Sequence, residues 1–438
     1  MVEGSVGIWL IGAKGGVATT VALGLNALRR GLVDSVGLVS ELPQFAAVEL
    51  AAWDEFVIGG HDIRSARLYD EAVALHSASR VFDGNLLKAC KDDLLALEPN
   101  FRSGTLHNVG TTIEKLADNG TRNLESPRDA VSRIRDDLEE FRAAHNLRHV
   151  VVVNVASTEP PTAAGVPDTW EEVRASLARI ECPLPASSLY AIAAFESGCS
   201  YVNFTPSIGA DLPALRELAE REEQCHAGRD GKTGETLLKS VLAPMFAARN
   251  LEIMSWVGHN IFGNMDGVVL NDPANKQTKV ASKDKLLGDI LGYSPQSLVS
   301  IEYIQSLGDW KTAWDHIHFR GFLGTPMTLQ FTWQGCDSLL AAPLVLDLVR
   351  FAERSHRAGE TGVLAHLGSF FKSPMGESPV EFAEQFRQLG DWVRRTAANM
   401  PAGDATPPDE EASEQHVNGN GASSTNGTHA EAESKNSV

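Results

Sequence analysis

A glycine-rich turn near the N-terminus connects an apolar strand to an apolar helix, and this junction limits the folds that the chain can adopt. Residues 6–11 form a short apolar run, a turn containing Gly12, Gly15 and Gly16 follows, and residues 17–28 have the pattern of an apolar helix. Strand, glycine turn and helix in this order are typical of the opening of a doubly wound parallel sheet. We therefore predict an α/β fold.

The alternation of strands and helices continues beyond this turn. We expect a second strand over residues 35–40 that ends in Glu41, a helix over 126–144, a β-branched strand over 150–153 and a helix over 211–221. The helix over 126–144 begins with a Ser-Pro pair, which suits an N-cap followed by the first helical position. These elements favour a Rossmann-like, doubly wound domain.

The pattern changes from about residue 230. A long helix over 236–249 and a strand over 252–257 precede a segment, 314–333, whose apolar residues alternate as in a half-exposed sheet. Apolar helices return near the C-terminus, which then gives way to a segment with almost no large apolar side chain and an expectation of disorder. We predict a Rossmann-like domain over 1–229, an inserted α+β domain over 230–336, a return to the first domain over 337–400, and a disordered tail over 401–438.

Composition excludes several classes of protein. The formal charge of −19 disfavours nucleic acid as a partner, because phosphate backbones are bound by basic surfaces. No apolar run has the roughly 20 residues of a membrane span, and the N-terminus lacks a signal-peptide pattern. The five cysteines form no CxxC pair, which argues against disulfides and a thiolate zinc site. We expect a soluble cytoplasmic protein.

The glycine turn is a candidate nucleotide site. Its spacing departs from the GxGxxG fingerprint, so an ordinary strand-to-helix turn remains an alternative, and no GK[ST] follows Lys14 as a P-loop would require. An acid at the end of the second strand, Glu41 or alternatively Asp62, would accept from a ribose 2′-hydroxyl and favour NAD over NADP, unless it is merely a solvated carboxylate. The candidate cofactor residues of the turn are Gly12, Ala13, Lys14, Gly15, Gly16 and Val17.

Polar residues also follow two later strands. Asn154, Ser157 and Thr158 follow one strand, and Asn203 lies in a similar setting. The carboxyl ends of parallel strands border the ligand crevice of an open sheet. These residues are therefore candidate cofactor contacts, although hydrogen-bonded turns would explain them equally well.

Lysines gather among aspartates and asparagines in the second half of the chain. Lys279 and Lys283 are four residues apart on a predicted helix and share one face. Lys372 follows two phenylalanines, and a lysine on such an apolar wall can acquire a lowered pKa and exchange protons near neutrality. This favours a phosphosugar or another anionic carbonyl substrate, and solvated surface lysines are the alternative. The group comprises Lys232, Lys239, Lys279, Lys283, Lys311 and Lys372, with Asp230, Asn260, Asn264, Asp266 and Asp337.

Several of these segments together resemble the myo-inositol-1-phosphate synthase family, most closely its compact archaeal form. The resemblance runs in order from about residue 5 to about residue 395. The glycine turn matches the archaeal pattern and departs from the eukaryotic one, and Asn203-Phe204-Thr205 stands where eukaryotic members have Asn-Gly-Ser. The similar segments are 39–43, 154–160, 203–207, 231–236, 264–267, 279–283, 309–313 and 371–374.

The resemblance implies an NAD domain built from both ends of the chain and a catalytic domain between them that also mediates a homotetramer. It implies an NAD-dependent isomerase-cyclase that converts D-glucose 6-phosphate to 1D-myo-inositol 3-phosphate, the first step of inositol biosynthesis. The stages are oxidation at C5, enolisation, aldol attack of C6 on C1, and reduction at C5. The implied catalytic residues are Asp230, Asn260, Asp266, Lys279, Lys283, Lys311, Asp337 and Lys372.

Individual roles follow from the charge that each stage develops. Lys372 and Lys279 are expected at the C5 and C1 oxygens, where ammonium groups would stabilise alkoxide or enolate charge. Lys311, held by Asp337, is expected to orient the carbonyl, and Lys283 to face the phosphate. Some members use a divalent and others a monovalent cation, which Asp230 and Asp266 could hold together with the phosphate.

Two other functions remain open on the sequence alone. One is an NAD-dependent phosphosugar dehydrogenase that releases its oxidised product, and it would accumulate NADH. The other is a catalytically silent tetrameric scaffold, against which the complete set of lysines and aspartates argues.

Overall fold

The computed structural model describes residues 4–118, 120–121, 125–162, 165–179, 181–264, 267 and 287–399. Three of the expected catalytic residues, Asp266, Lys279 and Lys283, lie outside the described residues, as does the predicted tail over 401–438. Among the helices that the structure describes, none combines the length and apolar character needed to cross a membrane.

A parallel sheet of seven strands forms the centre of the described chain, in the order β11-β6-β5-β4-β1-β2-β3. Strand order 3-2-1-4-5-6 is that of dinucleotide-binding domains, and here β11 extends it by one strand. This confirms the predicted α/β, doubly wound fold. The strands are β1 (Ser5–Ile11), β2 (Phe56–Asp62), β3 (Phe101–Ser103), β4 (Leu147–Asn154), β5 (Ser200–Asn203), β6 (Cys225–Gly228) and β11 (Gly362–Val363).

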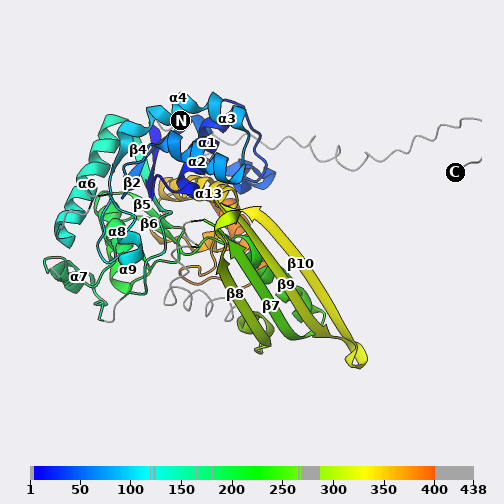
Figure 1. The fold of residues 1–438 in the computed structure, drawn as a ribbon. Helices are drawn as coiled ribbons and strands as arrows, with labels where there is room; N and C mark the ends of the chain where they lie inside the picture. Colours follow the sequence, from blue (N-terminus) through cyan, green and yellow to red (C-terminus); the bar gives the residue numbers. More distant parts are fainter. Residues whose placement is uncertain are drawn as a thin grey trace, which may run out of the picture. The chain divides into compact units, whose positions relative to one another are not determined.

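Helices cover both faces of this sheet (Figure 1). Ile8 and Leu10 of β1 belong to one apolar core, with α1 and α13, whereas Trp9 and Ile11 belong to a second core, with α6 and α8. Successive side chains of a strand point to opposite faces, so the apolar run of β1 is buried on both sides. The helices on the first face include α1 (Gly16–Arg29), α13 (Asp337–Arg357) and α14 (Phe382–Ala398), and those on the second include α6 (Pro127–Ala144), α7 (Trp170–Ser176), α8 (Ala186–Glu196) and α9 (Pro213–Arg221).

Shorter elements connect the strands. The remaining helices are α2 (Leu68–Ser79), α3 (Gly84–Ala89), α4 (Lys91–Ala96) and α5 (Thr111–Glu114). Single 3₁₀ turns form η1 (Val39–Glu41), η2 (Pro43–Val48), η3 (Trp53–Glu55), η4 (Glu98–Asn100), η5 (Gln305–Leu307), η6 (Phe322–Gly324) and η7 (Ala365–Phe370).

A second sheet has the strand order β10-β9-β7-β8, and Figure 1 shows its four long strands side by side. β9 is antiparallel to both β7 and β10, and β7 is parallel to β8. Phe246 of helix α10 packs with Ile253, Trp256 and Ile317 to form a small core of its own. The elements are α10 (Gly234–Ala248), β7 (Glu252–Phe262), β8 (Gln296–Tyr303), β9 (Trp310–Arg320) and β10 (Pro326–Cys336).

After this second sheet the chain returns to the first one through α13, which packs beside α1. The helix expected over 126–144 is confirmed as α6, with Ser126 accepting a hydrogen bond from the Asp129 amide (3.1 Å) and Pro127 in the first turn. The precise domain boundaries, 229/230 and 336/337, stay a prediction.

The second strand expected over residues 35–40 is wrong. Residues 35–38 form turns, Val39–Glu41 is the 3₁₀ turn η1, and the strand that pairs with β1 is β2, which ends in Asp62. The physical reason lies in α13. Its Asp347 carboxylate accepts from the Val39 amide (2.8 Å) and the Ser40 amide (2.9 Å), so a side chain satisfies the donors that a neighbouring strand would have taken.

Asp347 yields a testable pH dependence. Burial raises the pKa of its carboxyl to about 6, whereas an unfolded chain has an aspartate pKa of about 3.9. The folded state therefore binds the proton more tightly, and the stabilisation from this group is complete below the unfolded pKa and lost as the pH rises through the folded pKa. Asp347→Asn cannot titrate and loses one acceptor.

We expect Asp347→Asn to lower the free energy of unfolding at pH 4, and the deficit to shrink by on the order of 3 kcal/mol by pH 7. Urea denaturation of both proteins at the two pH values measures the difference. A deficit that stays constant or grows with pH would contradict this assignment.

Candidate functional site

A cavity of about 700 Å³ opens at the carboxyl ends of the parallel strands. Its wall includes Ile11 at the end of β1, Asp62 at the end of β2 and Asn154 at the end of β4. Lys311 of β9 and Asp337 at the start of α13 line the same space. The cavity therefore occupies the ligand crevice of a doubly wound sheet and is completed by residues from the second sheet.

The glycine turn forms one wall of this cavity, and its geometry requires glycine. Gly12 has a φ of +82°, and a Cβ there would lie 2.8 Å from the Cα of Ala156. A Cβ on Gly16 would lie 2.6 Å from the hydroxyl oxygen of Ser338. Gly16 begins α1, whose first turn carries no acidic side chain, so its amide groups can receive an anion.

The side chain of Thr19 supports a ligand at this turn. Its hydroxyl is buried, has no hydrogen-bond partner in the described structure, and belongs to a residue that lines the cavity. A buried hydroxyl without a partner is costly. A bound diphosphate at the N-terminus of α1 could satisfy it, so the residues present fit a dinucleotide.

The structure brings only part of the expected turn to the cavity. Gly12, Gly15, Gly16 and Val17 line it, whereas Ala13 is buried and Lys14 turns elsewhere. The Lys14 ammonium pairs with Glu98 at 2.7 Å and lies over the ring of Phe101. The backbone of Lys14 contributes instead: its amide donates to Asp62 at 2.7 Å, and its carbonyl oxygen accepts from Arg64.

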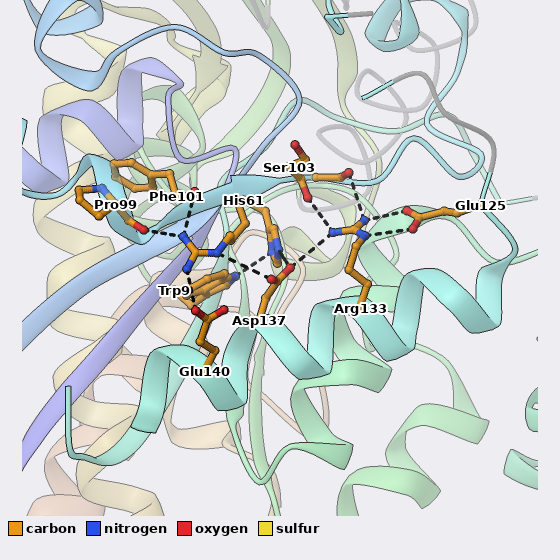
Figure 2. A network of polar contacts seen from close by, with 11 residues as sticks. Trp9, His61, Pro99, Phe101, Ser103, Glu125, Arg133, Asp137 and Glu140 are labelled. Atoms are coloured by element: carbon orange, nitrogen blue, oxygen red, sulfur yellow. Dashed lines mark hydrogen bonds and ion pairs between the residues drawn. The ribbon is translucent and has the colours of Figure 1, made fainter. Parts of the chain in front are cut away.

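His61 holds the glycine turn in place and belongs to a network of polar contacts with Trp9 and Asp137 (Figure 2). Its backbone oxygen accepts from the amides of Gly12 (2.9 Å) and Ala13 (3.0 Å). The indole of Trp9 donates to Nδ1 of His61 at 2.9 Å, so the ring proton resides on Nε2, 2.9 Å from Asp137.

Both ring nitrogens of His61 are thus occupied, and burial lowers the pKa of this histidine. The guanidinium groups of Arg102 and Arg133 lie 3.8 and 3.5 Å from Asp137 and hold its carboxylate in position. Figure 2 shows the contact with Arg133. His61 lines the cavity as a neutral, fixed ring. Sequence reasoning did not select His61.

Of the two acids proposed for the ribose, the structure brings Asp62 to the cavity and not Glu41. Asp62 ends β2, and its two oxygens accept from the amides of Lys14 (2.7 Å) and Arg64 (2.9 Å). Glu41 pairs with Arg350 (2.5 Å) and accepts from the Trp53 indole (3.0 Å), and it is absent from the cavity wall.

The polar residues after β4 and β5 divide into a lining set and a supporting set. Asn154, Ser157 and Thr158 line the cavity. Asn203 is buried behind it, accepts from the Thr205 hydroxyl (2.9 Å), and lies 3.3 Å from the amide nitrogen of Asn154. Its contribution is to hold the loop rather than to face a ligand.

Glu159 also lines the cavity, although sequence reasoning did not select it. The Ser187 amide donates to it at 2.8 Å, and the Ser187 hydroxyl donates to its other oxygen. Complete burial raises the pKa of this carboxyl to about 7. The only signal in the sequence is that Glu159 lies in the polar segment that follows β4.

Two lysine–aspartate pairs also line the cavity. Lys372 approaches Asp230 at 2.8 Å, and Lys311 approaches Asp337 at 3.4 Å. Asn264 donates to the second oxygen of Asp337 at 3.1 Å. All five residues line the cavity, so the described lysines and aspartates that were expected to be catalytic converge.

Asn260 occupies an adjoining recess of about 20 Å³, which Lys311 and Lys372 also line. It is buried and donates to Glu235 at 2.5 Å. Among the described residues, no three His, Cys, Asp or Glu side chains are placed to hold a metal ion. The cation expected between Asp230 and Asp266 stays a prediction, because Asp266 lies outside the described part of the chain.

Asp309 is a further residue that sequence reasoning did not select as part of the site. Its carboxylate accepts from the Ser338 amide (2.9 Å) and the Ser338 hydroxyl (3.0 Å), and it lies 2.5 Å from the Cys336 sulfur. Burial raises the pKa of this carboxyl. Asp309 therefore joins the start of β9, which carries Lys311, to the first turn of α13, which carries Asp337.

Comparison with known proteins agrees with this arrangement. The family model described as myo-inositol-1-phosphate synthase, an NAD-binding family, matches residues 6–394. Inositol-3-phosphate synthase 1 of Bacteroides thetaiotaomicron is 33% identical over 433 residues, covering 91% of this chain and 96% of the relative. The inositol-3-phosphate synthase of Spirodela polyrhiza is 28% identical, with 80% of this chain and 75% of the relative covered.

Solved structures show the same fold. The inositol-3-phosphate synthase of Caenorhabditis elegans superposes with a TM-score of 0.81 at 24% identity, covering 90% of this chain and 86% of that one. A myo-inositol-1-phosphate synthase-related protein from Thermotoga maritima gives a TM-score of 0.73 at 23% identity, with coverage of 89% and 98%. With its family model, its relatives and its fold in agreement, this chain belongs to the myo-inositol-1-phosphate synthase family.

Proposed function

We infer that this chain is an NAD-dependent inositol-3-phosphate synthase that converts D-glucose 6-phosphate to 1D-myo-inositol 3-phosphate. The observation that carries this conclusion is the pair of lysine–aspartate contacts in the cavity that the glycine turn also lines. A dinucleotide site alone would suit many dehydrogenases. Two fixed ammonium groups beside it suit a reaction that develops charge on several sugar oxygens.

The cofactor would lie along the glycine turn. The amides at the start of α1 and the Thr19 hydroxyl would receive its diphosphate, and Asp62 would accept from the adenosine ribose. Asn154, Ser157 and Thr158 would border its other half. Bound NAD supplies a reversible hydride acceptor for C5 of the sugar.

The lysines would stabilise the oxygens that become charged in each stage. Lys372, held 2.8 Å from Asp230, is positioned to hydrogen-bond the C5 oxygen and to exchange a proton with it. Lys311, held by Asp337, would orient the carbonyl that the enolate attacks. The family resemblance of the sequence adds two further lysines to the proposal. Lys279 would contact the C1 oxygen, and Lys283 would face the phosphate.

The first turn of α10 offers a place for the substrate phosphate. Thr233, its N-cap, lines the main cavity together with Lys311 and Lys372. Glu235 lies in the same turn, but its negative charge is paired with Lys239 at 2.7 Å, inside the protein. Helix amides and two ammonium groups are a favourable environment for a phosphate dianion.

A cation held by Asp230 and Asp266 against this phosphate is part of the proposal, as is a cytoplasmic location. Loss of activity on chelation, restored by one added metal ion, tests the first. Fractionation of the cells that make the protein tests the second.

The reaction itself distinguishes a cyclase from a dehydrogenase. With NAD and glucose 6-phosphate, we expect the phosphorus NMR spectrum to show inositol phosphate. The steady-state concentration of NADH, measured by its absorbance, should stay far below the concentration of product. The reason is that the hydride removed from C5 returns to C5. NADH formed in equal amount to product would establish the dehydrogenase alternative instead, and absence of turnover would favour the scaffold.

Lys372 is the lysine whose replacement should be most informative. Lys372→Ala removes an ammonium group from a developing oxyanion, and we expect kcat to fall by about 10²–10³-fold with NAD affinity nearly unchanged. Lys372→Arg should recover little activity, because guanidinium does not release its proton near neutral pH. Lys88→Ala, which removes an exposed lysine from α3, is the matched control and should retain full activity. Wild-type kcat in Lys372→Arg would rule out a proton-transfer role.

We also infer a homotetramer assembled through the second sheet. Phe322 and Leu323, in the turn between β9 and β10, are 88% and 87% exposed, and Trp314 of β9 is 44% exposed. Large apolar side chains exposed in this way are common at subunit contacts. We expect light scattering to give the mass of a tetramer and Phe322→Ser/Leu323→Ser to lower it. A wild-type protein with the mass of a monomer would exclude this assembly.

A further inference from the structure

Three charged side chains surround the place where the adenosine ribose is expected. Asp62 ends β2, Arg64 follows two residues later, and Glu71 lies in the first turn of α2. All three line the main cavity. Of these three, Asp62 is one of the two acids, with Glu41, that the sequence offers for discrimination between NAD and NADP.

The guanidinium of Arg64 is held on all of its nitrogens. Its Nε lies 3.5 Å from Asp62, its Nη1 donates to Glu71 at 3.2 Å, and its Nη2 donates to the carbonyl oxygen of Lys14. The last contact ties it to the glycine turn. Arg64 is thus anchored at the ribose end of the cavity and is turned toward two carboxylates.

NADP differs from NAD by a phosphate on the ribose 2′-hydroxyl, which is the group that an acid at the end of the second strand contacts. In dinucleotide-binding domains a nearby arginine accommodates that phosphate. Here an arginine stands at the right position, but two carboxylates and one guanidinium leave the group with a net charge of −1. A 2′-phosphate would have to displace Arg64 from Glu71 and approach both carboxylates.

We propose that Glu71 is a specificity-determining residue which excludes NADP by holding Arg64 away from the 2′-phosphate and by adding a second negative charge. Asp62 accepts a hydrogen bond from the ribose hydroxyl. Glu71 pairs with Arg64, which would otherwise be available to bind a phosphate. This inference rests on the proposed placement of NAD along the glycine turn.

The proposal predicts a gain of NADP binding on neutralising Glu71. In Glu71→Gln, Arg64 loses its closest carboxylate and the local charge rises from −1 to 0. One unit charge about 6 Å from a phosphate in a partly solvated site changes affinity by roughly tenfold. We expect the Kd for NADP, measured by isothermal titration calorimetry, to fall by about that factor, with the Kd for NAD changed less than about twofold.

Two further variants separate this mechanism from a general charge effect. Asp70→Asn removes the same charge from the neighbouring residue, which is exposed and pairs with Arg67 at 2.8 Å, and it should leave NADP binding unchanged. In Glu71→Gln/Arg64→Ala the gain should disappear, because the arginine is the group that Glu71→Gln releases. Thermal melting of each variant verifies that it is folded.

The outcomes are distinct. A tighter NADP Kd in Glu71→Gln that Arg64→Ala abolishes and Asp70→Asn does not reproduce supports the proposal. An unchanged NADP Kd in Glu71→Gln, or an equal gain in Asp70→Asn, overturns the proposal for Glu71. If the wild-type protein binds NAD in the same experiment, the proposed cofactor placement is not affected by that result. Failure of the wild-type protein to bind NAD overturns both the cofactor placement and this inference.

Discussion

The close approach of α13 to the glycine turn is the constraint on which the site depends. Gly16 has no room for a side chain because the hydroxyl of Ser338 occupies that space, and Ser338 is in turn held by Asp309. These contacts bring together an N-terminal turn, the start of β9 and the start of a helix more than 300 residues further along. Because cofactor-side and substrate-side residues share this junction, a shift of either helix would change the distance between them.

Local charge, rather than overall charge, equips an acidic protein for two anionic ligands. The chain carries a formal charge of −19, yet its cavity combines the amide-rich start of α1 with two ammonium groups that are each held by an aspartate. A lysine paired in this way keeps its orientation and loses little conformational entropy when a ligand arrives. The net negative charge of the chain is compatible with this site, because water and dissolved salt largely screen exposed charges that lie more than about 10 Å away.

The sequence was informative where local chemistry decides the structure. The apolar run before Gly12 and the Ser-Pro start of α6 follow from backbone geometry and capping, and the structure places both where they are expected. The strand expected over residues 35–40 is wrong, because Asp347, a partner about 300 positions away, satisfies the amides of Val39 and Ser40. The side chains of Lys14 and Glu41 do not line the cavity for a similar reason, because they form ion pairs with Glu98 and Arg350. Patterns in sequence do not report such tertiary competition.

The distribution of the site along the chain has a consequence for biosynthesis. The glycine turn leaves the ribosome before Ser338 and Lys372, which lie more than 300 residues further along the chain. Contacts between such distant segments form late, because the intervening chain must be ordered first. A prematurely terminated chain would therefore possess the sequence for the cofactor turn but lack the helix that closes against it, and it could not turn over sugar phosphate. Completion of translation and acquisition of activity are coupled by topology alone.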